Sequence, residues 1–196
     1  MALTPTTQLE AVNAILSNVG QSPVSTLEVS GFADVAVAKK LLERISRSVQ
    51  KRGWHFNTDD DYTLSVNGDG KIPVPSNALV CDPMPSEDID AVPRGQFLYD
   101  REEHTFQFTD SVDCRIVWFL AFEDLPEALR EYIMIRAARI FQSEGFGSIQ
   151  LDSFKEEDEF RALADLLEYE VEQGDYNILN GSYSTANILR RTEPQY

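Results

Sequence analysis

The chain has 196 residues, of which 42% are hydrophobic and 10% aromatic, so it can build one folded domain, or one domain with an insertion, and is not a disordered chain. Its net charge of −16 repels nucleic-acid phosphates, which argues against sequence-specific DNA binding. Polar residues 1–10 and an apolar run confined to residues 116–122 predict a soluble protein without a signal peptide or a membrane span.

Two amphipathic helices are predicted at the start of the chain. The first lies within residues 4–20, where Leu9, Val12, Leu16 and Val19 repeat at helical spacing and Gly20 suits a left-handed cap. The second covers residues 34–52 and ends at Gly53. Its predicted buried stripe consists of Ala38, Leu41, Leu42, Ile45 and Val49.

The second helix also carries all the bases of the first 52 residues. They are Lys39, Lys40, Arg44, Arg47, Lys51 and Arg52. Residues 1–52 hold four acids and six bases, whereas residues 53–196 hold 29 acids and 11 bases. Two interpretations remain open: a surface that docks by charge complementarity, and a solvated helix face.

Alternation of polar and apolar residues predicts a small antiparallel sheet within residues 54–123. Trp54 and Phe56 are expected to anchor this sheet in the core, His55 to point outward, and residues 59–61 to form a solvated connection. A hairpin is predicted from residues 62–66, the turn "NGDG" and the run that starts at Lys71.

The rest of the sheet is predicted from prolines and apolar runs. Five prolines between residues 72 and 95 exclude a helix and favour edge strands and loops. Residues 95–110 suggest two aromatic-rich strands about a polar turn, and "VDCRIVWFLAF" suggests a central strand. Cys81 and Cys114 are expected to be reduced core residues.

Two more helices are predicted after the sheet. One begins near residue 124 and ends at Gly145, with a buried stripe of Leu129, Ile133, Ala137, Ile140 and Phe141. The other covers residues 149–173, with a buried stripe of Phe160, Leu163, Leu167 and Val171. The predicted fold is therefore α+β: a four-helix bundle of residues 1–53 and 124–174, with an antiparallel β-rich insertion of residues 54–123 between the second and third helices.

The last helix is strongly acidic, and a polar tail follows it. Residues 149–175 hold ten acids and two bases, and the acids expected to face the basic helix are Glu156, Glu157, Asp158, Glu159, Glu168, Glu170 and Glu172. Residues 175–196 show no helical period and are interpreted either as an extended arm that packs on a partner or as a frayed end. The arm residues expected to make contact are Tyr176, Ile178, Leu179, Tyr183, Ile188, Leu189, Arg190 and Arg191.

The sequence shows no motif typical of catalysis. His55 and His104 are the only histidines, and no C-x-x-C accompanies them, so a zinc site lacks ligands. Leu64 stands where a calcium loop requires glycine, and no phosphate-binding glycine loop or G-x-S-x-G is present. One alternative for His55 is a general base beside Asp59, but no nucleophile accompanies them. We therefore expect no cofactor, no metal and no enzymatic activity.

Four segments resemble the tail tubular protein A family, the adaptors of short-tailed phages. They are "AVNAILSNVGQSPVSTLE" (11–28), "RSVQKRGWHFNT" (47–58), "LPEALREYIMIRAARIF" (125–141) and "EYEVEQGDYNILNG" (168–181). The resemblance implies a dodecameric ring in the virion tail, bound to the portal protein above and to the nozzle protein, tail tubular protein B, below. It also implies a bore through which DNA passes during ejection.

Physical reasoning adds expectations to this resemblance. Carboxylates along a channel repel phosphates and let DNA slide. The basic and acidic stripes are expected to meet between neighbouring subunits, and residues 175–196 to clasp the portal. The isolated chain is expected to be a monomer that assembles on the portal. Two alternatives remain open: a glycan-hydrolysing tail enzyme acting on the host envelope, and a regulatory module that binds a small protein.

Overall fold

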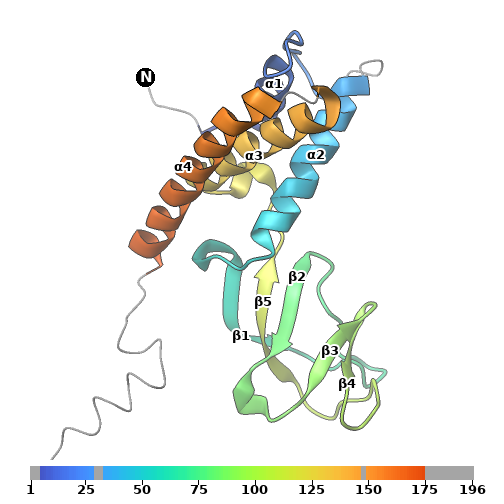
Figure 1. Cartoon of the computed structure of the whole chain (residues 1–196). Coiled ribbons are helices and arrows are strands. Elements are labelled where there is room, and N and C mark those ends of the chain that lie inside the picture. Colours follow the sequence, from blue (N-terminus) through green and yellow to red (C-terminus); the bar gives the residue numbers. More distant parts are fainter. Residues whose placement is uncertain (1–4, 29–32, 147–148, 175–196) are drawn as a thin grey trace, which may run out of the picture.

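A computed structural model describes residues 5–28, 33–146 and 149–174 (Figure 1). The helices are α1 (Gln8–Ser17), α2 (Ala33–Gln50), α3 (Glu127–Phe146) and α4 (Ile149–Gln173). The strands are β1 (Thr58–Leu64), β2 (Ala78–Pro83), β3 (Ala91–Arg94), β4 (Phe97–Asp100) and β5 (Val112–Trp118). Three short 3-10 helices are η1 (His55–Asn57), η2 (Pro85–Glu87) and η3 (Phe122–Asp124). The predicted α+β class, with strands between the second and third helices, is confirmed.

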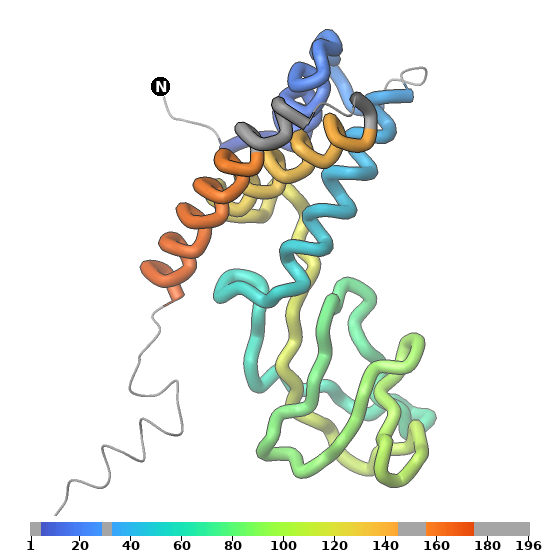
Figure 2. Tube along the Cα trace, in the orientation of Figure 1, coloured from blue at the N-terminus to red at the C-terminus, as the bar shows by residue number. Residues whose placement is uncertain are grey.

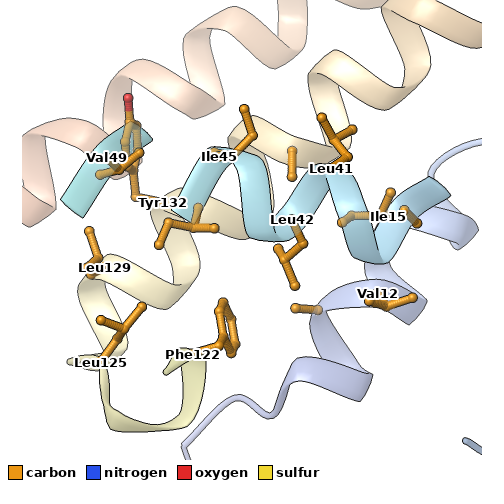
Figure 3. Close-up of a cluster of buried hydrophobic side chains, with 14 of the residues drawn as sticks. Val12, Ile15, Leu41, Leu42, Ile45, Val49, Phe122, Leu125, Leu129 and Tyr132 are labelled. Atoms are coloured by element: carbon orange, nitrogen blue, oxygen red, sulfur yellow. The ribbon is translucent and has the colours of Figure 1, made fainter. Parts of the chain in front are cut away.

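The helical core forms where α3 packs against α1, α2 and α4. Figure 3 shows Val12 and Ile15 of α1 facing residues of α2, with Phe122 and Leu129 closing the cluster from the α3 side. The predicted buried stripe of α2 is confirmed. Thr7 and Glu10 form a capping box at the start of α1, and the hydrogen bonds from Thr7 lower the pKa of the Glu10 carboxyl.

The strands form two small antiparallel sheets with a separate apolar cluster. One sheet has the order β1-β5-β2, and the other pairs β3 with β4. The prediction that residues 112–122 contain a central strand is confirmed by the place of β5 between two partners. The edge strands predicted from the prolines are confirmed by β2 and β3, which contain Pro83 and Pro93.

The predicted hairpin across residues 67–70 is wrong. The turn forms, since the Asn67 amide donates to the Lys71 carbonyl (2.8 Å), but β1 pairs with β5. The run after Lys71 instead lies against β4, through hydrogen bonds that Val74 and Ile72 make with Gln96 and Leu98. Proline has no amide hydrogen, so Pro73 and Pro75 cannot supply a continuous ladder to β1.

The junction between helices and strands also differs from expectation. Trp54 and Phe56 pack in the helical cluster, not in the sheet, and the Trp54 indole donates to the Val49 carbonyl (3.0 Å). Residues 59–61 are exposed but belong to β1, where a bulge lies between Asp59 and Tyr62. The prediction of a solvated connection is therefore wrong, because the strand starts immediately after η1.

The buried face of α4 is not the predicted one. Leu163 of the predicted stripe does pack against the core, but Phe160, Leu167 and Val171 are 71%, 44% and 68% exposed, and Ala162 and Leu166 are buried instead. The helix has two apolar sets at helical spacing, and polar contacts select between them. Glu159 and Glu170, on the same side as Leu166, bond to α3 and η1 respectively.

Candidate functional site

Two amide side chains hold the junction between the helices and the sheet. The Asn57 side chain accepts from the Trp54 amide (2.8 Å) and donates to the carbonyls of Gln50 (3.1 Å) and Trp118 (2.8 Å). The Gln50 side chain exchanges two hydrogen bonds with the backbone of Leu120, at 2.8 and 3.1 Å. Both side chains are buried. Removing either amide would therefore leave its backbone partners without these hydrogen bonds.

A histidine and a glutamate fasten the far end of α4 to this junction. The His55 amide donates to Glu170 Oε1 (2.9 Å), and His55 Nδ1 lies 2.5 Å from Glu170 Oε2. Their side chains are 22% and 10% exposed, and the Tyr169 ring lies beside the imidazole. The expectation that His55 points outward is therefore wrong. Asp59 instead accepts from the Trp118 indole (2.7 Å), so His55 and Asp59 do not form the general-base pair considered from the sequence.

Metal chemistry finds no support in the described part of the chain. Among the side chains that the structure describes, in residues 5–28, 33–144 and 156–174, no three His, Cys, Asp or Glu side chains are grouped closely enough to hold a metal ion. The same residues include no helix with the length and apolar character needed to cross a membrane.

The bases of α2 form a face directed away from the helical core. Lys40, Arg44, Arg47 and Lys51 follow one another at steps of four, three and four residues, which places them on one side of the helix. All four are exposed, opposite the buried stripe. We call this set, together with the exposed Val37 one turn earlier, the α2 face.

Some of the predicted bases already have contacts within the chain. Arg44 pairs with Glu144 at 3.0 Å, with both side chains about 60% exposed, and Arg47 lies over the Phe119 ring (4.9 Å). Lys39 is half-buried to the side of the α2 face, and Arg52 lies over the Trp54 ring (5.6 Å). The sequence predicted one stripe of six bases. In the structure four of the six share one face of the helix, and Lys39 and Arg52 lie outside it.

The acids of α4 divide into an inner and an outer set. Glu159 is only 13% exposed and pairs with Arg139 (2.6 Å) and Arg136 (3.4 Å) of α3, so it holds the two helices together. Glu157 pairs with Arg161 at 2.6 Å on the surface. The other exposed acids of the predicted set are Glu156, Glu168, Glu172 and Asp158, which lies 4.0 Å from Arg161. Their part in subunit contacts stays a prediction.

Sequence reasoning missed the exposed apolar residues of α4 and assigned three of them, Phe160, Leu167 and Val171, to the core. Phe160, Ala164, Leu167 and Val171 are all exposed and follow at steps of four, three and four residues. We call these four residues the α4 seam. The arm residues proposed to bind a partner, in residues 175–196, lie outside the described residues.

Comparison with known proteins identifies relatives along most of the chain. Residues 9–176 match the family described as Tail tubular protein. Tail tubular protein A of Klebsiella phage KP34 is 33% identical over 120 residues, which cover 61% of this chain and 63% of that relative. The match therefore spans somewhat less than two thirds of the relative's length.

Proposed function

The chain belongs to the tail tubular protein family, a structural component of phage tails, and from this we propose that it forms a ring joining the portal protein to the tail nozzle protein. The structure presents two unlike charged helix surfaces: the basic α2 face and the acidic outer side of α4. A structural role in the virion tail agrees with both features.

Charge segregation is the observation that carries the ring proposal. The α2 face is basic and the outer side of α4 is acidic, and both helices pack against α3. A surface on one copy that complements a different surface on the next generates a head-to-tail contact, which closes into a ring or extends into a filament. A dodecamer is the ring size that the family resemblance implies.

The high net negative charge supports passage of DNA through such a ring. Each chain has a net charge of −16 and 33 acids. A bore lined by such acids repels the phosphate backbone of DNA and does not bind it. The same composition would make the ring a poor non-specific DNA-binding protein. DNA passage and the portal and nozzle contacts belong to this proposal.

Electron microscopy of the purified chain with and without the portal protein of the same phage tests the proposal. We expect monomers alone and a ring stacked on the portal in the mixture. A chain that stays monomeric with portal and nozzle proteins present would refute the adaptor function. Release of sugars from host envelope glycans, abolished by a single carboxylate substitution, would favour a glycan-hydrolysing enzyme.

The C-terminal residues are proposed to make the portal contact. Deleting residues 175–196 should abolish portal binding in a pull-down assay and change the melting temperature little. Retained binding by the truncated chain would assign the portal contact to another surface.

A further inference from the structure

Large exposed apolar side chains are concentrated on α4. Five are exposed among the described residues, and three of them, Phe160, Leu167 and Val171, lie on the α4 seam. Isolated exposed apolar residues are normal on protein surfaces. A line of them along one helix is different, because neighbouring turns combine into a continuous strip that favours contact with another protein.

The spacing of the α4 seam fits a second helix. Steps of four, three and four residues are those of the contact line between two helices that pack lengthwise. Acids border this line: Glu156 and Glu157 precede Phe160 by one turn, and Glu168 and Glu172 directly follow Leu167 and Val171. A complementary helix therefore needs apolar surface along its centre and positive charge at its edges.

The α2 face has these properties. Its residues Val37, Lys40, Arg44, Arg47 and Lys51 follow at steps of three, four, three and four, which is again the spacing of a lengthwise contact. Val37 is 51% exposed, and it is one of the two large exposed apolar residues that lie outside α4 in the described part of the chain. Lysine and arginine lay their methylene stems along apolar surface while their charged ends reach acids at the border. A mainly basic face can therefore cover an apolar seam bordered by carboxylates.

We infer that the α4 seam binds the α2 face of a second copy of this chain, with the apolar seam at the centre of the contact and the charges around it. The inference deepens the proposed ring function and rests on it. Within one copy the two surfaces belong to helices that lie on different sides of α3 (Figure 1), so pairing them between copies leaves one free surface of each kind at the ends. The contact can then repeat until a ring closes.

Chemical cross-linking tests the contact directly. One copy carries Arg44→Cys, at the middle of the α2 face, and a differently tagged copy carries Ala164→Cys, at the middle of the α4 seam, so the two sites approach in either helix orientation. The native Cys81 and Cys114 are buried and do not compete. A short bismaleimide should yield about ten-fold more mixed dimer than the control mixture of Arg44→Cys with Glu103→Cys, which lies in an exposed turn of the β-rich part.

The cross-link is measured on the chain alone at high concentration and on the portal-bound assembly. A yield equal to the control in both samples overturns the inference. If the chain binds the portal but gives no cross-link, the adaptor function is supported and only the proposed α2–α4 contact is refuted. If the chain gives the cross-link but does not bind the portal, the α2–α4 contact is supported and the proposed adaptor function is refuted.

Charge reversal gives a second measurement on the same assembly. Lys40→Glu with Lys51→Glu in the Arg44→Cys copy should lower the mixed-dimer yield to the control level, and adding Glu168→Lys with Glu172→Lys to the Ala164→Cys copy should restore it. None of these four residues contributes to the core, so all variants should melt as the parent does. Unchanged yield in the first variant, or no recovery in the second, would overturn the pairing.

Discussion

Leu166 and Leu167 provide a sharp test of how α4 is oriented. They are adjacent and chemically identical, but Leu166 is fully buried and Leu167 is 44% exposed. Truncating a buried leucine to alanine removes its transfer free energy and leaves a cavity, which together cost about 3 kcal/mol. Leu167 loses only part of its burial and leaves no cavity, so Leu167→Ala should cost about 1 kcal/mol. Helix propensity changes equally in both variants and cancels.

Urea denaturation followed by far-UV circular dichroism measures this difference of about 2 kcal/mol. With a slope of about 2 kcal/mol/M, the midpoint for Leu166→Ala should lie about 1 M below that for Leu167→Ala. Low protein concentration keeps any association through the α4 seam from stabilising one variant. Equal midpoints, or a lower midpoint for Leu167→Ala, would show that α4 buries the other side, as the sequence pattern alone suggested.

Three further predictions concern the junction and the sheet. Asn57→Ala should destabilise the chain by about 2–4 kcal/mol in urea denaturation, because two buried backbone groups and one partly buried group lose their partner, and the exposed Asn77→Ala is the control. Gly53→Ala should cost about 1–2 kcal/mol in the same assay, since φ is 76° and a Cβ would lie 3.2 Å from Val117 Cγ2; a neutral effect would contradict this backbone conformation. Neither cysteine should react with a thiol reagent before unfolding, because both are buried. The hydrogen bond between the two thiols raises the pKa of Cys114, as does burial, but it lowers the pKa of Cys81, so the protection of Cys81 rests on burial alone. Rapid labelling of the native chain would contradict that packing.

Local patterns predicted those elements that depend on local sequence. Helix α2 has one apolar face and one basic face, so only one orientation of the helix buries its leucines. β5 alternates a buried face of Val112, Cys114 and Ile116 with a face that carries Asp113 and Arg115, so only one register buries its apolar residues. In both cases a single solution satisfies the hydrophobic pattern.

Long-range contacts decided what the sequence pattern left undetermined. α4 offers two apolar sets, and the choice depends on Glu170 meeting His55, 115 residues earlier, and on Glu159 meeting two arginines of α3. Likewise β1 has a suitable turn beside it but pairs with β5, about 50 residues later. The α2 face was visible as charge in the sequence, but the α4 seam was not, because exposure of an apolar residue is a property of packing.

The path of the chain at the junction has a consequence for modular replacement. Thr58 is paired with Val117, so the insertion leaves and re-enters the helical part on neighbouring strands, as the teal and yellow segments of Figure 2 show. Adjacent strands are roughly 5 Å apart, a gap that a tight turn can bridge. We therefore expect that the segment between these two positions can vary in length and chemistry, or be exchanged for another sheet, while the surfaces of α2 and α4 keep their geometry.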